Sequence, residues 1–142
     1  MAGMRMAQGR LHVETRGRGL HEVSAELAAW LGRQSIGTGL LTLFLRHTSA
    51  SLLIQENAAP EVRSDLETFF GALAPEDARR YRHDDEGPDD MPAHIRAALL
   101  PTQLAIPVAD GRMLLGTWQG VYLWEHRRSP HRREILLTLL GD

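Results

Sequence analysis

Three histidines lie in polar segments that separate apolar stretches of the chain: His47, His83 and His94. The chain has no cysteine, so a bound metal ion would have to be held by imidazole and oxygen ligands. Imidazole together with carboxylate is the ligand set of Zn²⁺, Mn²⁺ and Fe²⁺ sites. We therefore expect these three histidines to hold one divalent ion, Zn²⁺ or similar, with a coordination position open for water or substrate. The alternative is that they bind an anion without any metal ion.

Two of these histidines, His83 and His94, bracket an acidic segment that carries five carboxylates. Asp84 and Glu86 are the candidates for a general base, and with Asp90 they are also candidate acceptors for the free ring N–H groups of ligating histidines. The competing interpretation is a solvated acidic loop, because carboxylates just before a helix also favour the helix dipole.

The segment that begins at His47 follows a buried strand. Strand ends lie at the rim of a sheet, where binding sites are commonly built, so Thr48 and Ser49 are candidate hydroxyl donors to a substrate. A turn stabilised by its own small hydroxyl residues is the plainer alternative.

A third polar segment runs from Gly116 to Gly120 and holds Thr117, Trp118 and Gln119 between its glycines. Glycines let the backbone approach a ligand closely, and a tryptophan supplies an apolar wall. The alternative is that Trp118 belongs to the core.

Three ionisable residues, Glu125, His126 and Arg127, close the next apolar run. Strand alternation places Glu125 and His126 on opposite faces, so at most one of them is expected to enter a given pocket. Glu125 is a catalytic candidate, and the Arg127 guanidinium is a candidate fork for phosphate. The alternative for Arg127 and the arginines that follow it, through residue 133, is a solvated connection.

The elements that must position these residues are short. Apolar patterning predicts strands at residues 12–14, 40–45, 51–55, 103–108, 112–118, 121–125 and 134–140, with a hairpin turn at Asp110-Gly111. Helices are predicted from Ser24 as N-cap, from Pro60 and from Pro92. Strands and helices in no regular alternation predict a single α+β domain over residues 11–142 with mixed or antiparallel sheets, preceded by a disordered or tag-like tail at residues 1–10.

The bulk composition excludes several classes of function. The net charge of −2 argues against a protein whose main role is to bind the nucleic acid backbone. No apolar run reaches the length of a membrane span. The N-terminus has no apolar core typical of a signal peptide, so we expect a soluble cytoplasmic protein. All 16 basic residues are arginine, which excludes lysine chemistry and leaves guanidinium groups, hydroxyls and amides to hold phosphate.

Taken together, the polar segments resemble the YjbQ family, also known as secondary thiamine-phosphate synthase enzymes. The segments that carry the resemblance occur in the family's order and cover the chain from about residue 11 to its end; they are residues 47–51, Asn57, 60–65, 83–84, 86–87, 89–92, 94–95, 116–120 and 125–127. Trp124 departs from the family pattern, in which smaller residues are usual at this position, and residues 129–131 are less glycine-rich.

The resemblance implies an α+β fold, a homotrimer and a small-molecule enzyme. The activity attached to the family couples a hydroxymethylpyrimidine diphosphate to a thiazole phosphate and releases pyrophosphate, as a main or a side activity. The candidate site residues within these segments are Asp84, Glu86 and Glu125 for catalysis, His47, His83 and His94 for the metal, and Thr48, Ser49, Asn57, Thr117, Trp118, Gln119 and Arg127 for the phosphorylated substrate.

Two other classes of function stay open. One is a metal-dependent hydrolase, in which Asp84 or Glu86 serves as the base. The other is a non-catalytic trimer that binds a metal ion or a small molecule. A serine nucleophile is disfavoured because the chain has no Gly-x-Ser-x-Gly motif.

Overall fold

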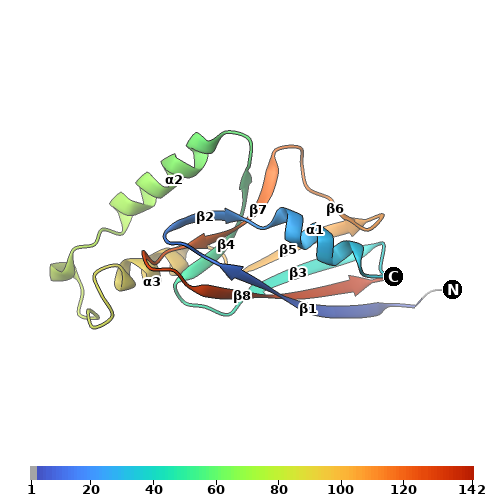
Figure 1. Cartoon of the computed structure of the whole chain (residues 1–142), viewed down its shortest axis with the longest axis horizontal. Coiled ribbons are helices and arrows are strands. Elements are labelled where there is room, and N and C mark those ends of the chain that lie inside the picture. Colours follow the sequence, from blue (N-terminus) through green and yellow to red (C-terminus); the bar gives the residue numbers. More distant parts are fainter. Residues whose placement is uncertain (1–2) are drawn as a thin grey trace.

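All strand pairings in the described part of the chain, residues 3–142 of a computed structural model, are antiparallel. They build two sheets (Figure 1), one with the strand order β1-β8-β3-β5-β6 and one with the order β2-β7-β4. The elements in chain order are β1 (Arg5–Glu14), β2 (Gly19–Glu22), α1 (Ser24–Gly32), β3 (Gly39–Leu45), β4 (Ala50–Glu56), α2 (Pro60–Leu73), the short 3₁₀ helix η1 (Ala78–Arg80), α3 (Asp90–Leu99), β5 (Gln103–Ala109), β6 (Arg112–Met113), β7 (Gln119–Glu125) and β8 (Arg132–Gly141). The α+β prediction is confirmed.

The main core lies on one face of the larger sheet. In β3 and β8 alternate residues are buried, as expected for strands with one face on the core. Leu41 and Leu43 of β3 and Leu137 and Leu139 of β8 are at most 1% exposed. Leu27 and Leu31, one helical turn apart on α1, pack against the same core.

The smaller sheet connects the core to the two helices nearest the polar segments. Trp124 on β7 is fully buried, and its Nε1 donates to Glu67 of α2 at 2.7 Å. Arg96 of α3 donates to the same carboxylate at 2.8 Å. The ring of Phe70 lies edge-on to Trp124 at 5.1 Å. Trp124 therefore helps to hold α2 and α3 together, so the sequence departure at this position has a structural role.

Several local predictions differ from the structure. Residues 5–10, expected in a tail, form the first half of β1 and pair with β8, where Arg5 faces Gly141. Ser24 does not cap α1: its hydroxyl donates to Glu22 and accepts from the backbone N–H of Val121. The strand expected at residues 112–118 stops at Met113, because the chain turns away toward β7.

The predicted hairpin between β5 and β6 is confirmed. Asp110 and Gly111 both have positive φ, 52° and 71°, which is the conformation of a tight two-residue hairpin turn. Among the helices of the described chain, none combines the length and the apolar character needed to cross a membrane.

Candidate functional site

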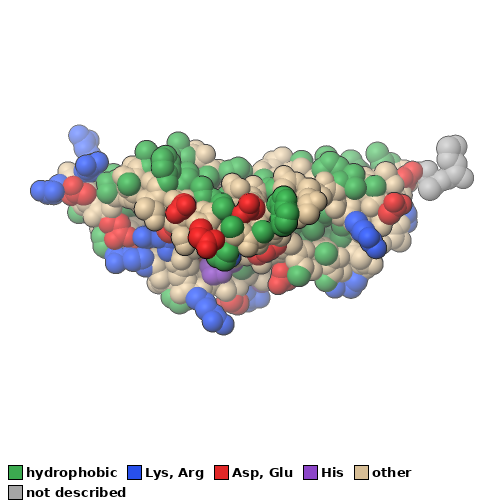
Figure 2. All heavy atoms as spheres, turned by 90° about the horizontal axis from the view of Figure 1, so that it is seen from above, with side chains coloured by type: hydrophobic (Ala, Val, Ile, Leu, Met, Phe, Trp, Pro, Cys, Tyr) green, Lys and Arg blue, Asp and Glu red, His purple; other side chains and the backbone are tan. Residues whose placement is uncertain are grey.

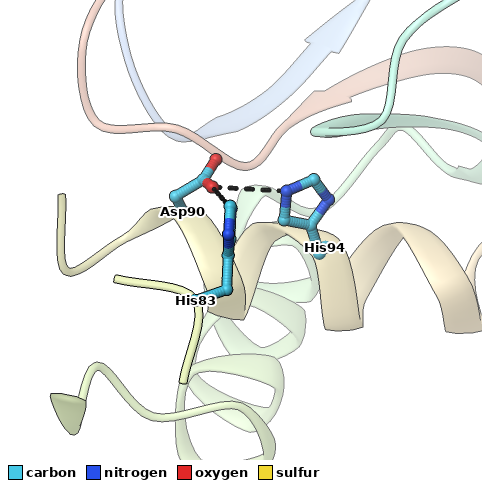
Figure 3. A group of neighbouring side chains, drawn as sticks. All are labelled: His83, Asp90 and His94. Atoms are coloured by element: carbon cyan, nitrogen blue, oxygen red, sulfur yellow. Dashed lines mark hydrogen bonds and ion pairs between the residues drawn. The ribbon is translucent and has the colours of Figure 1, made fainter. Parts of the chain in front are cut away.

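Three potential metal ligands converge where the acidic segment meets α3. One ligand atom each from His83, Asp90 and His94 lies within 4.8 Å of the others, and we call this group the acid–histidine cluster. Figure 3 shows both imidazole rings directed at the carboxylate. Oδ2 of Asp90 is 2.8 Å from Nε2 of His83 and 3.3 Å from Nε2 of His94. Two of the three predicted histidine ligands are thus neighbours.

Local structure explains this convergence. Asp90 and His94 are four residues apart at the start of α3, so they share one face of the helix. His83 lies seven residues before Asp90 and is returned to it by a loop that turns at Gly87, whose φ of +103° disfavours any residue with a Cβ. The carbonyl of Gly87 accepts from the N–H of Asp90 at 3.3 Å.

Arg127, just past β7, anchors the carboxylates under the cluster. Its Nη1 donates to Asp90 at 2.9 Å, its Nε donates to Asp89 at 3.1 Å, and its Nη2 donates to the carbonyl of Glu86 at 2.7 Å. The backbone N–H of Arg128 adds a further bond to Asp89 at 2.8 Å. The expected phosphate fork is therefore occupied by acceptors of its own chain.

The buried member of the acid–histidine cluster is its carboxylate, Asp90. The Asp90 side chain is only 3% exposed, whereas those of His83 and His94 are 45% and 33% exposed. Burial by itself raises the pKa of Asp90, but the hydrogen bond with His83 and the charges of His94 and Arg127 together hold that pKa below its usual value. Asp90 is thus an ionised acceptor, and both rings stay accessible from outside.

The two predicted acid–base residues of this segment, Asp84 and Glu86, are exposed to solvent beside the cluster. His83 also contacts a third exposed acid, Asp85, through Nδ1 at 3.4 Å. The segment therefore supplies solvent-exposed carboxylates around the two rings, while Asp89 and Asp90 are buried.

His47 lies elsewhere in the chain and is not a member of the acid–histidine cluster. It lines an open cleft of about 570 Å³ at the ends of β3 and β4, which we call the strand-end cleft; its polar lining is Arg46, His47, Thr48, Ser49, Thr102 and Arg133. Its Nε2 accepts from the backbone N–H of Glu134 at 2.9 Å. Within one chain the expected three-histidine site is therefore split between two places.

Glu125 is a buried anchor in this chain. It is fully buried and accepts from Thr15, from the backbone N–H of Arg127 and from the guanidinium of Arg133. Burial raises its pKa, but the hydrogen bonds from Arg133 and Thr15 outweigh this effect and lower the pKa. A carboxylate enclosed in this way does not reach a substrate, so the expected catalytic role of Glu125 is not supported by the geometry.

His126 is also fully buried, although strand alternation directs its side chain away from the face of Glu125. Strand β7 is covered on both faces, so alternation does not separate buried from exposed residues there. Nε2 of His126 lies 2.9 Å from the Ser51 hydroxyl, while its Nδ1 has no hydrogen-bond partner within residues 3–142. Burial, with the charges of Arg96 and Arg133 beside it, lowers the pKa of His126 to about 3.

Of the remaining predicted binding residues, Thr117, Trp118 and Gln119 lie at the turn that leads into β7, and Asn57 directly follows β4. The Gln119 side chain accepts from the N–H of Gly116 at 2.8 Å and so closes the turn itself. Thr117 is exposed, and Trp118 is 63% exposed at the tip, so it is neither core nor a wall of a closed pocket. Asn57 donates to Glu22 at 3.3 Å.

Arg133 is the functional candidate that the sequence interpretation missed. The pattern of consecutive arginines suggests a solvated residue, yet Arg133 is 4% exposed and faces the strand-end cleft. Strand alternation contained the signal, because Arg133 has the parity of the buried residues Ile135, Leu137 and Leu139.

Comparison with known proteins decides the family. The profile of the family described as "UPF0047 protein YjbQ-like" matches residues 9–142. The chain belongs to this YjbQ-like family. It is 53% identical to the UPF0047 protein sll1880 of Synechocystis sp., over 99% of this chain and 96% of that one. It is 45% identical to the UPF0047 protein YjbQ of Escherichia coli O157:H7, over 95% and 98% of the two chains.

Solved structures of similar proteins agree with the fold. The conserved hypothetical protein TT1486 of Thermus thermophilus superposes with a TM-score of 0.82 at 35% identity, over 92% of this chain and 98% of that one. A YbjQ-like protein of unknown function from Sulfolobus solfataricus P2 gives a TM-score of 0.88 at 21% identity, over 99% and 100% of the chains, and is a likeness of fold alone.

Proposed function

We propose that this YjbQ-like protein is an enzyme for small phosphorylated molecules that holds a divalent metal ion at His83, Asp90 and His94. The observation that supports the proposal is the convergence of three ligand atoms within 4.8 Å, with both imidazole rings accessible to solvent. Two imidazoles and one carboxylate match the three-ligand sets of catalytic zinc sites. In this proposal Asp90 is the third metal ligand, the role expected from the sequence for His47.

Neighbouring residues fix the orientation of the Asp90 carboxylate that such a metal site requires. Arg127 holds the Asp90 carboxylate through Oδ1 and so leaves Oδ2 directed at both rings. Because Arg127 is itself held by Asp89 and by the Glu86 carbonyl, the carboxylate cannot rotate freely. When bound, a divalent ion would supply positive charge next to the departing oxygens of a phosphate or diphosphate.

The reaction that we propose is the one attached to the resemblance. A C–N bond forms between the thiazole nitrogen and the pyrimidine methylene carbon, the C–O bond to the diphosphate breaks, and pyrophosphate leaves. The thiazole nitrogen has no proton to lose in this reaction, so Asp84 or Glu86, exposed beside the cluster, would give a proton to the departing pyrophosphate and take one back from water.

A metal-dependent hydrolase is the second candidate, because the same exposed carboxylates are placed to act as a base toward water. The test separates the two. Metal-stripped protein is reloaded with Zn²⁺, Mn²⁺ or Mg²⁺ and offered the two coupling substrates together, and separately a panel of phosphate esters. Thiamine phosphate with pyrophosphate as products supports the coupling reaction, and ester hydrolysis alone supports the hydrolase. No turnover under any condition contradicts both.

We also propose that the chain assembles as a homotrimer. The amphipathic helix α2 has no buried residue within its own chain, and Phe69 and Leu73 on it are 61% and 52% exposed. Leu114 and Trp118, in the segment before β7, are similarly exposed at 58% and 63%. Both segments are at the top of Figure 1, and Figure 2, seen from that side, shows apolar side chains spread over the face. Such apolar surface is typical of a region that another subunit covers.

A further inference from the structure

The tautomer of His47 follows from one contact. The backbone N–H of Glu134 donates to Nε2 of His47 at 2.9 Å. A neutral imidazole has one acceptor nitrogen and one N–H, and a protonated imidazole has no acceptor. The ring is therefore neutral with its proton on Nδ1. Burial and the nearby Arg133 charge, which lower the pKa of His47, act in the same direction.

The Nδ1–H group faces a second donor. Nη1 of Arg133 is 3.5 Å from Nδ1 of His47, at the outer limit of a hydrogen bond. Because a guanidinium only donates, neither group can satisfy the other. The other two nitrogens of Arg133 donate to Glu125 and Ser49, so Nη1 is the nitrogen that is left toward the cleft.

These two donors belong to a cleft with further donors around it. The strand-end cleft is also lined by the hydroxyls of Thr48 and Ser49 and by Arg46, whose side chain is 53% exposed. Arg46 is bonded to Glu134 at 3.3 Å, and Arg133 is paired with Glu125. His131, which is close enough to influence the pKa of His47, adds no fixed negative charge.

Arg10 also contacts Glu134, at 3.4 Å. The guanidinium groups of Arg10, Arg46 and Arg133 therefore pair with only two carboxylates, those of Glu134 and Glu125, which leaves a net positive charge at the rim of the strand-end cleft.

We propose that the strand-end cleft binds the phosphate group of a phosphorylated ligand, with phosphate oxygens that accept from Nδ1 of His47 and Nη1 of Arg133. An anionic acceptor between two donors removes their conflict. Donors from an imidazole, two guanidinium groups and hydroxyls approach from several directions, which suits the three free oxygens of a phosphate better than the two coplanar oxygens of a carboxylate. The site assigns His47 to anion binding instead of metal ligation.

The inference deepens the proposed function, because a phosphorylated substrate would bring the anion, but phosphate binding itself needs no metal ion. It is therefore tested on metal-stripped protein. Nitrogen-15 NMR of the histidine rings should show His47 with its proton on Nδ1, and that resonance should move when inorganic phosphate is added. A His47 ring protonated on Nε2, or a resonance that phosphate leaves in place, overturns the proposal.

Calorimetry with inorganic phosphate supplies the matched comparison. His47→Leu should weaken phosphate binding by about tenfold or more, the loss expected for one hydrogen bond to a charged group. His12→Leu is the control, since His12 also contacts Glu134, at 3.2 Å, but lies outside the cleft lining. Equal binding by both variants overturns the proposal.

Binding of glycerol phosphate distinguishes a phosphate monoester of a substrate from free inorganic phosphate as the occupant of the cleft. If it binds as tightly as inorganic phosphate, the cleft accepts the monoester of a substrate. If it fails to bind while inorganic phosphate binds, the occupant is free phosphate. A loss of metal binding in the acid–histidine cluster would leave these results unchanged, so the two proposals fail separately.

Discussion

Nη1 of Arg127 donates to Oδ1 of Asp90 at 2.9 Å, while the other oxygen of the same carboxylate lies 2.8 Å from Nε2 of His83. One side of Asp90 is thereby occupied by a fixed cation and the other is directed at the histidines. Since Asp90 is 3% exposed, this pairing also keeps a buried carboxylate ionised. The geometry of the acid–histidine cluster therefore depends on a residue 37 positions away in sequence.

Removal of either histidine of the cluster should abolish metal binding. Protein purified without a histidine tag is expected to hold about one divalent ion per chain, the stoichiometry of a single three-ligand site. His83→Ala and His94→Ala should lose the ion with circular dichroism unchanged, whereas His12→Ala, outside the cluster, should retain it. The same trace metal content in all four proteins, measured by elemental analysis, would show that the cluster is not a metal site.

Replacement of Arg127 by lysine should loosen Asp90. The charge is kept, but the three-way bonding to Asp89, Asp90 and the Glu86 carbonyl is lost. We expect metal affinity to fall by roughly 10- to 100-fold, as for residues that orient ligands, and the free energy of unfolding to fall by about 1–3 kcal/mol.

Arg128→Lys is the matched control for this change, because the Arg128 side chain is 56% exposed and contacts Glu76 instead. Urea unfolding and metal competition titrations measure both effects. If the Arg127 and Arg128 variants behave alike, Arg127 does not position Asp90.

Glu125→Gln should be strongly destabilising. It leaves the Arg133 guanidinium, 5% exposed, without its counter-charge in the core, a change that costs about 3–5 kcal/mol in comparable buried pairs. Glu14→Gln, which removes an exposed pair with Arg132, should cost at most about 1 kcal/mol. Chemical denaturation at neutral pH compares them, and equal losses would contradict the buried-pair interpretation.

The same carboxylate predicts acid sensitivity. Because the folded-state pKa of Glu125 lies below its ordinary value of 4.5, its contribution to stability is complete above that value and is lost as the pH falls through the lower folded-state pKa. The Glu125→Gln variant lacks this titration. Its free energy of unfolding should therefore decline less steeply with acid than that of the unaltered protein.

His126 predicts a second pH dependence at milder acidity. The unfolded chain takes up a proton near pH 6.5, but the buried ring does so only at about 3. As the pH falls between these values the unfolded state is favoured, and His126 should remove about 1 kcal/mol of stability for each pH unit. His126→Gln, which can still contact Ser51, should lose this slope in urea titrations. An unchanged slope would show that the ring takes up its proton at a similar pH in the folded and the unfolded protein.

The oligomeric state is directly measurable. Light scattering should return three times the chain mass of 15.9 kDa. Leu73→Asp on α2 places a charge on the exposed apolar face and should shift the mass toward that of one chain. A monomer mass for the unaltered protein contradicts the trimer.

Much of the chemistry and of the fold could be predicted from local patterns. Pro60 and the 3.6-residue spacing after it predict α2, Asp110-Gly111 predicts the hairpin, and short apolar runs of strand length predict β3 and β8. These features depend on neighbours in sequence. The same is true of Asp90 and His94, because a spacing of four residues on a helix brings two side chains together wherever the helix packs.

Only the tertiary structure decided which distant residues meet. Residue type groups His47 with His83 and His94, but the end of β3 places it against Glu134 and Arg133 of β8. The registers of antiparallel strands determine such contacts, and a register depends on pairing across the whole sheet.

Burial of charge was the other property that the sequence left open. The sequence suggests a catalytic acid at Glu125 and a solvated connection at Arg133, yet together they form an ion pair inside the protein. Neither would be buried alone, because an isolated charge loses far more hydration energy than the core returns. Each residue's place is therefore a property of the pair, and only the folded chain brings the pair together.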